Sequence, residues 1–177
     1  INKSLVTSIS AVGGMSVGIS GKDGNLIIAK KLNHRTKDTD SAIENLVDLG
    51  YVGIPDKVDK QVLDALLGVN MIPVVAPLGL GADGQTYNIN ADTAAGSIAS
   101  ALNASRLLML TDVDGVLDDT GKLIPRLSIA QARKLILNGV IKGGMIPKVE
   151  TCIQAVQAGA GAAVILDGRK KHAVLVE

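Results

Sequence analysis

Aromatic side chains are nearly absent from this sequence. Its 177 residues include 2 Tyr, no Phe and no Trp. Proteins that bind single-stranded nucleic acids stack bases on aromatic rings, so the scarcity argues against that class. The 18 Lys and Arg residues are balanced by 17 Asp and Glu residues, which leaves no basic surplus for a phosphate backbone. We therefore expect no nucleic-acid partner.

Cysteine and long apolar runs are also scarce. The single cysteine, Cys152, excludes an internal disulfide and fits a reducing compartment. No apolar run approaches the ~18 residues of a membrane span, and no signal segment opens the chain. These features predict a cytoplasmic protein without a membrane partner. The chain opens with Ile1 and not Met, as expected of a trimmed product or a fragment.

What the sequence does contain is apolar runs alternating with helical patterns. With 47% apolar residues and a length that suits one domain, residues 1–177 can bury a core of Val, Ile, Leu, Ala and Met. The alternation predicts an α/β fold, a three-layer αβα sandwich with a mostly parallel central sheet. Strands are expected at 15–20, 26–29, 47–52, 71–78, 107–110 and 162–166, with an edge element at 173–176. Helices are expected at 1–10, after Asp59, and at 91–104, 128–138 and 145–158.

Two glycine-rich segments resemble nucleotide motifs only superficially. Residues 20–24 have turn chemistry and predict a β-hairpin between the strands at 15–20 and 26–29. They do not form a Walker phosphate loop, because the segment lacks the other residues of that pattern. Gly79, Gly81 and Gly84 match G-x-G-x-x-G, but no helix follows directly and no acid stands at the required spacing. A loop over 79–84 is therefore favoured over a dinucleotide site. The polar segment 33–41 is also expected to be a loop.

Three further segments carry polar residues near the carboxyl ends of expected strands, where ligands of parallel sheets bind. Asn88, Asn90 and Asp92 alternate before a helix, which indicates either a cap or a polar ligand. Residues 111–119 form an acidic loop, either solvated or holding a nucleotide or metal. Gly143 and Gly144 precede a helix that carries Lys148, either a solvated lysine or a phosphate contact.

The remaining polar and sulfur residues give no metal or nucleophile pattern. Neither His34 nor His172 has acids or cysteines at zinc spacing, so no metal ligand is expected. Cys152 lies on an apolar helix face and is expected in the core.

Taken together, these segments resemble the N-acetylglutamate kinases of the amino acid kinase family. The resemblance covers essentially the whole chain, and Asn-x-Asn-x-Asp at 88–92 and Gly-Gly-Met-Ile-Pro-Lys at 143–148 are its most specific parts. The other segments that carry it are 17–24, 34–40, 47–53, 84–95, 110–117 and 166–169.

The resemblance implies ATP-dependent phosphorylation of the side-chain carboxylate of N-acetyl-L-glutamate, a step of arginine biosynthesis. It implies that Asn88 and Asn90 bind this substrate, that Asp92 orients the catalytic lysines, and that Lys148 stabilises the transferring phosphoryl group. Mg²⁺ would be held mainly by the nucleotide phosphates. The residues implied to line the nucleotide are Asp112, Val113, Gly115, Val116, Leu117, Val140, Ile141, Lys142, Gly144 and Met145.

The chain departs from the family because nothing in it matches the amino-terminal half with its phosphate-binding lysine, and we also expect it to stop short of the family's last strand region. We expect the nucleotide-binding part of a homo-oligomeric enzyme, with little or no kinase activity by itself. Arginine inhibition involving His172 and Glu177 is a further expectation. The alternatives are a non-catalytic nucleotide-binding module and a kinase with a different acceptor.

Overall fold

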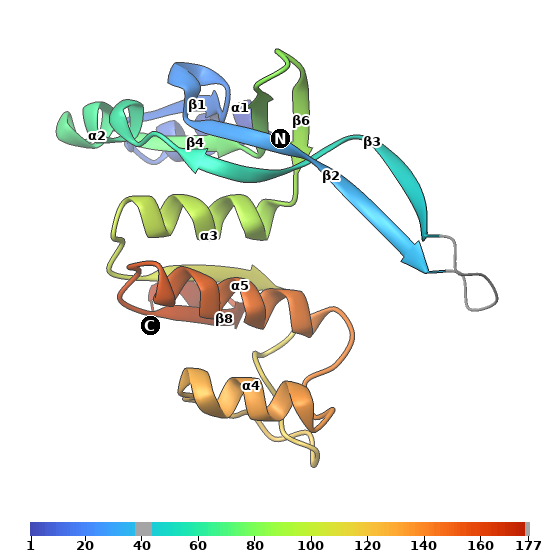
Figure 1. Ribbon diagram of the computed structural model, residues 1–177. Coiled ribbons are helices and arrows are strands. Elements are labelled where there is room, and N and C mark those ends of the chain that lie inside the picture. Colours follow the sequence, from blue (N-terminus) through green and yellow to red (C-terminus); the bar gives the residue numbers. More distant parts are fainter. Residues whose placement is uncertain (38–43, 176–177) are drawn as a thin grey trace. The chain divides into compact units, whose positions relative to one another are not determined.

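The computed structural model describes residues 1–37 and 44–175, which divide into two compact units, Ile1–Ala94 and Ala95–Glu177 (Figure 1). The first unit contains α1 (Asn2–Ala11), β1 (Ser16–Ser20), the 3-10 turn η1 (Asp23–Asn25), β2 (Ile27–Lys37), β3 (Glu44–Val58), α2 (Gln61–Gly68), β4 (Ile72–Ala76), β5 (Leu78–Gly81) and β6 (Thr86–Ile89). Helix α3 (Ala91–Ala101) continues from β6 into the second unit. There it is followed by β7 (Leu107–Thr111), α4 (Ile129–Leu137), α5 (Met145–Gln157), β8 (Ala163–Asp167) and the 3-10 turn η2 (Ala173–Leu175).

A pair of parallel strands forms one part of the first unit. Strand β1 pairs with β4 from Ser16 opposite Ile72 to Ser20 opposite Ala76. Helix α1 is tied to this pair by Asn2, whose amide group donates to the carbonyl oxygens of both strands, at Ile19 and Val74. The side-chain amide thus bridges the two strands at one point.

The remaining strands of the first unit close into a small barrel in the order β2-β3-β6-β5. The hairpin predicted at 15–29 is wrong, because β1 pairs with β4 while β2 pairs with β3 in a much longer antiparallel hairpin (Figure 1). The predicted loop at 33–41 is also wrong for 33–37, which belong to β2, and residues 38–41 lie outside the described residues. Turn residues such as Gly24, with φ of +59°, specify a change of direction but not the strand that becomes the partner.

The glycine motif at 79–84 lies in this barrel and is not the predicted loop throughout. Gly79 and Gly81 belong to β5, which turns back through Gly84 to pair antiparallel with β6. A Cβ on Gly79 would lie 2.8 Å from the Cβ of Ala29, which cannot move without its backbone, so packing favours glycine here. The motif therefore forms a strand and a turn, and no helix opens from it.

The second unit is built on the parallel pair β7 and β8, in register from Leu107 opposite Ala163 to Thr111 opposite Asp167. Buried residues of α3, β7 and α5 form one apolar cluster that includes Ala99, Met109 and Ala155. Cys152 packs against this cluster, as the sequence predicted.

Helix α4 begins where its cap predicts. Ser128 accepts a hydrogen bond from the backbone N–H of Gln131, whose side chain accepts one from the backbone N–H of Ser128 in return. Gly139, with φ of +71°, follows the end of the helix, as expected of a helix stop. Ala132 of α4 then packs with Val149 and Ile153 of α5 in a second apolar cluster.

The predicted α/β class is confirmed, with helices packed on parallel strand pairs. The predicted edge element at 173–176 is wrong for 173–175, which form η2, and Val176 lies outside the described residues. The longest helix among the described residues, α5, has 13 residues, and none there offers a membrane-spanning apolar stretch.

Candidate functional site

The segment Asn88 to Asp92 leads from β6 into α3. Tyr87 and Ile89 are buried, whereas Asn88 and Asn90 are exposed, so the predicted alternation is present. The side-chain oxygen of Asn90 accepts the backbone N–H of Thr93 at 3.1 Å, which makes Asn90 the helix cap. Of the two asparagines predicted to bind substrate, Asn90 thus already serves the helix, and Asn88 stands exposed beside it.

The sequence allows two roles for Asp92, a helix cap or a functional carboxylate. Because Asn90 makes the cap bond, the half-buried carboxylate of Asp92 in the first turn of α3 is not needed for that purpose. Lys148 lies in the second turn of α5 and is half-buried. Asp92 belongs to the first unit and Lys148 to the second, so their predicted joint action stays a prediction.

The loop after β7 carries the acidic residues predicted to meet a nucleotide. Asp112 and Val113 are exposed at the carboxyl end of the strand. Gly115 is buried with φ of +138°, and a Cβ there would lie 2.9 Å from Leu123 Cδ1 and 3.2 Å from the carbonyl oxygen of Ile165. Glycine is therefore favoured at this position by the backbone conformation, and the Ile165 carbonyl oxygen leaves little room for a Cβ.

The segment Val140 to Met145 leads into α5. Ile141 is almost fully buried, whereas Lys142 is exposed. Gly143 has φ of +58°, and a Cβ on Gly144 would meet no atom within 4 Å. Gly144 is the N-cap of α5, and no side chain caps the helix there. The positive end of the helix dipole therefore lies at the 143–144 backbone.

The structure brings these two predicted segments together. Val116, from the loop after β7, packs in the same apolar cluster as Ile141 and Met145, from the approach to α5. Exposed Asp112 and Lys142 belong to the same two segments. Ile141 is buried in this cluster, whereas Val116 and Met145 are half-buried and Asp112 and Lys142 are exposed, so these last four are the ones accessible to a ligand. That they bind a nucleotide stays a prediction.

A third segment, to which the sequence analysis assigned no role, lies next to the loop after β7. Asp167 ends β8, next to the end of β7, and is buried. Arg169 makes a two-point ion pair with Asp167 and also donates to the backbone carbonyl of Asp112. The signal was present, because Asp-Gly-Arg follows a predicted buried strand just as the acidic loop follows β7.

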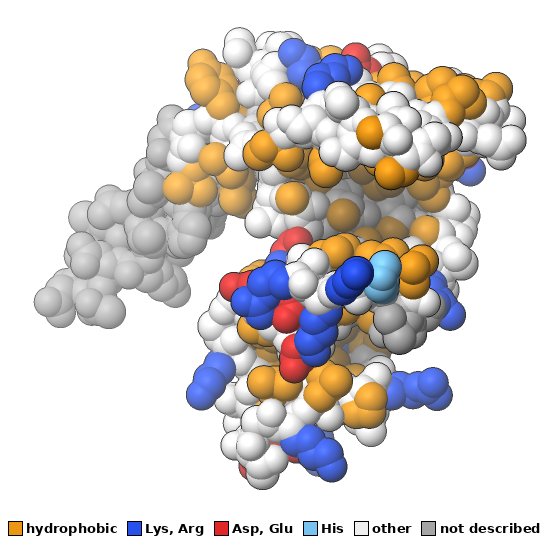
Figure 2. Space-filling model, turned by 180° about the vertical axis from the view of Figure 1, so that it is seen from behind, with side chains coloured by type: hydrophobic (Ala, Val, Ile, Leu, Met, Phe, Trp, Pro, Cys, Tyr) orange, Lys and Arg blue, Asp and Glu red, His pale blue; other side chains and the backbone are white. Residues whose placement is uncertain are grey.

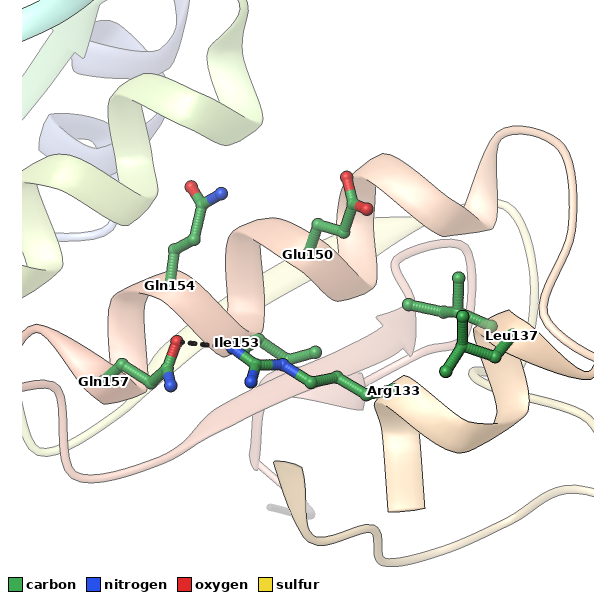
Figure 3. A pocket seen from close by; sticks show the side chains of 7 residues that line it. Arg133, Leu137, Glu150, Ile153, Gln154 and Gln157 are labelled. Carbon is green, nitrogen blue, oxygen red and sulfur yellow. Dashed lines mark hydrogen bonds between the residues drawn. The ribbon is translucent and has the colours of Figure 1, made fainter. Parts of the chain in front are cut away.

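A groove of about 390 Å³ lies between α4 and α5 (Figure 3). Arg133 of α4 donates to the side-chain oxygen of Gln157 of α5 at 3.1 Å across it. None of the residues predicted to contact nucleotide or substrate lines this groove. Its lining consists of Arg133, Ile136, Leu137, Glu150, Ile153, Gln154 and Gln157.

The described residues hold no cluster of three or more His, Cys, Asp or Glu side chains placed to bind a metal ion. His172 is exposed, with φ of +61°, and Glu177 lies outside the described residues. Figure 2 shows basic and acidic side chains interspersed on the face in view.

A model of the amino acid kinase family matches residues 1–167. The chain is 60% identical over all 177 residues to an acetylglutamate kinase from Gluconobacter oxydans, and it spans 60% of that protein's length.

Two solved structures share the fold. A Streptococcus mutans protein superposes with a TM-score of 0.78 at 32% identity, covering 93% of this chain and 62% of that one. The N-acetylglutamate synthase of Neisseria gonorrhoeae, solved with coenzyme A and L-arginine, superposes with a TM-score of 0.74 at 26% identity. In that case 92% of this chain and 34% of the other are covered.

Proposed function

This chain belongs to the amino acid kinase family, and from that premise we propose that it is the nucleotide-binding part of an ATP-dependent N-acetyl-L-glutamate kinase. The product is N-acetyl-L-glutamyl 5-phosphate, an intermediate of arginine biosynthesis. The observation that carries the proposal is the 60% identity with an acetylglutamate kinase over the full chain. Because the chain spans 60% of that relative, the activity is proposed for the whole enzyme and not for these residues alone.

The nucleotide is proposed to lie against the half-buried side chains of Val116 and Met145, which buried Ile141 supports from the core. Their packing in one cluster supports this placement, because it brings together the two segments that the resemblance assigns to the nucleotide. Exposed Asp112 and Lys142 are proposed to contact its polar groups. When ATP is bound, its phosphates are proposed to hold Mg²⁺, which neutralises their charge.

The proposed reaction needs no general base, because a carboxylate nucleophile is already ionised at neutral pH. The protein's part is to position the carboxylate and to neutralise charge on the transferring phosphoryl group. Exposed Asn88 is proposed to bind the acetylated amino acid, with Asn90 acting mainly by fixing the start of α3. Lys148 supplies positive charge to the transition state, and Asp92 orients it.

Nucleotide binding is tested first, by the melting temperature of the 177-residue chain. ADP at about 100 times its dissociation constant is expected to stabilise the fold by ~2.7 kcal/mol, a rise of about 5–10 °C. NAD is the control for the dinucleotide alternative, and β5 and its turn give no helix start to bind one. A rise with NAD and none with ADP would overturn the nucleotide assignment.

Catalysis is tested in the complete enzyme of which this chain is proposed to be a part. Replacing Lys148 by Ala is expected to lower turnover by about 10²–10³-fold, the usual cost of removing one preorganised charge. The control is Lys171→Ala, since Lys171 is an exposed lysine in another segment. Near-normal turnover of Lys148→Ala would refute its role. The 177-residue chain alone is expected to form ADP no faster than background.

The acceptor is tested with a panel of N-acetyl-L-glutamate, free amino acids and carbamate. We expect acyl phosphate formation only with N-acetyl-L-glutamate, because the exposed amide of Asn88 is proposed to bind the acetylated amino group, which carbamate lacks. Equal rates with carbamate would instead favour a kinase with a different acceptor. ATP binding by the whole enzyme without turnover of any acceptor would favour a non-catalytic module.

Arginine feedback, assembly and location complete the proposal. The solved synthase of Neisseria gonorrhoeae that shares this fold contains L-arginine, which supports a test of arginine as an inhibitor of the whole enzyme. A homo-oligomer is expected, and light scattering of the whole enzyme measures it. The single Cys152 is consistent with a cytoplasmic location.

A further inference from the structure

The turn after β8 is bonded to the loop after β7 at three points. The backbone N–H of Gly168 donates to the carbonyl oxygen of Thr111 at 2.9 Å. The guanidinium of Arg169 donates to the carbonyl oxygen of Asp112. The ammonium of Lys170 lies 2.6 Å from a carboxylate oxygen of Asp114. Three successive residues of one turn thus hold residues 111–114 of the other.

Arg169 is the best-anchored member of this set, because its partner Asp167 is buried, although the Arg169 side chain is itself 68% exposed. Its Nε donates to Oδ1 of Asp167 at 2.9 Å, and one Nη donates to Oδ2 at 2.9 Å, so the planar fork is held at both ends. Asp167 is 7% exposed and anchored at the end of β8. The hydrogen bonds from Arg169 lower the pKa of Asp167 to about 2, so the ion pair persists at neutral pH. The same Nη that pairs with Asp167 also reaches the Asp112 carbonyl.

The other two contacts are weaker guides. Lys170 and Asp114 are both more than half exposed, and water and salt screen such a pair. The Gly168 bond continues the parallel β7–β8 pairing by one residue and involves only backbone. Arg169 is therefore the side chain that holds the loop beyond the end of β7.

We infer that Arg169 is a positioning residue that holds the 112–114 backbone in its nucleotide-binding conformation before ATP arrives. The inference deepens the proposed function and rests on it, since the loop is assigned there to the nucleotide. A preorganised loop loses less conformational freedom on binding, which raises affinity without any contact between Arg169 and the ligand. Loss of this bond therefore weakens nucleotide binding, in addition to any stability lost when buried Asp167 loses its partner.

The experiment compares Arg169→Gln and Arg169→Lys with Lys171→Gln, a matched loss of charge from the same turn. In the 177-residue chain, isothermal titration with ADP is expected to give a dissociation constant on the order of ten-fold higher for Arg169→Gln. Arg169→Lys keeps the charge but lacks the fork, so it is expected to recover only part of the affinity. Lys171→Gln is expected to stay within about two-fold of the parent chain.

Hydrogen exchange of the chain without nucleotide gives a separate readout of the loop. Amides of 112–117 are expected to exchange faster in Arg169→Gln, with exchange in α5 nearly unchanged. The melting temperature is expected to fall, because buried Asp167 loses its partner, so exchange and ADP binding are measured well below the melting transition. Unchanged loop exchange, or an ADP affinity within two-fold of the parent, would overturn the inference. A parent chain that fails to bind ADP would refute the nucleotide assignment instead, while loop exchange still decides whether Arg169 orders the loop.

Discussion

Gly115 offers a sharp test of how the loop after β7 is built. Replacing it by Ala forces a residue with a Cβ into φ of +138°, a region that is essentially restricted to glycine. The backbone strain is about 1–3 kcal/mol. The new methyl would also lie 3.2 Å from the Ile165 carbonyl oxygen, whereas Leu123 Cδ1, 2.9 Å away, is the end of a 45% exposed side chain that can move aside. We expect Gly115→Ala to lower the free energy of unfolding by about 2–3 kcal/mol, of which backbone strain is the larger part.

Gly121 provides the matched control. It lies in the same unit with φ of +83°, but a Cβ there would meet nothing within 4 Å. Gly121→Ala therefore carries backbone strain without the steric clash, and we expect a loss of about 1 kcal/mol. The difference between the two variants measures the close contacts at Gly115 together with the extra strain of its φ of +138° over +83°.

Urea denaturation followed by circular dichroism is the appropriate assay for both variants. The chain has no Trp, and its tyrosines, Tyr51 and Tyr87, belong to the first unit, so fluorescence would not report on the second. Helices α4 and α5 of the second unit contribute to the dichroism signal. If Gly115→Ala loses no more stability than Gly121→Ala, the close packing described for this loop is incorrect.

Two further predictions concern the core and the acid range. Leu63 is 1% exposed, so Leu63→Ala is expected to cost about 2–5 kcal/mol, measured by urea denaturation with tyrosine fluorescence; a loss under 1 kcal/mol would contradict its burial. The pKa of Asp167 is lowered to about 2 from an ordinary 3.8, so its ionised form stabilises the fold. This contribution to stability is fully present above pH 3.8 and is lost as pH falls toward 2. Asp167→Asn should remove that part of the acid dependence; an unchanged pH profile of stability would contradict it.

The sequence alone determined the local elements of the second unit most accurately. Ser128 and Gln131 fixed the start of α4, and Gly139 its end, because a cap is a contact between neighbours in the chain. The apolar runs at β7 and β8 were recognised for a similar reason, since buried parallel strands are apolar throughout. The two segments implied to line the nucleotide were identified from short motifs, and the structure packs Val116 of one with Ile141 of the other.

Strand partners were decided only by tertiary structure. The run at 15–20 and the run at 26–29 are separated by a good turn, yet β1 pairs with β4 and β2 with β3. A turn sequence predicts that the chain changes direction there. Which strands pair depends on which distant strand can bury its apolar face on the same side of the sheet. Gly79 and Gly81 illustrate the same limit. The sequence does not distinguish a glycine that close packing favours in a strand from a glycine in a flexible loop.

Aromatic scarcity, charge balance and motif spacing, all visible in the sequence, limited the protein's class and indicated its family. The bond from Arg169 to the Asp112 carbonyl was not visible there, because it joins residues 57 positions apart. Such a contact exists only because parallel strands bring their carboxyl ends to one edge, where residues distant in the chain become neighbours. The sequence therefore determined which chemical groups are present, and the tertiary structure decided which of them act on one another.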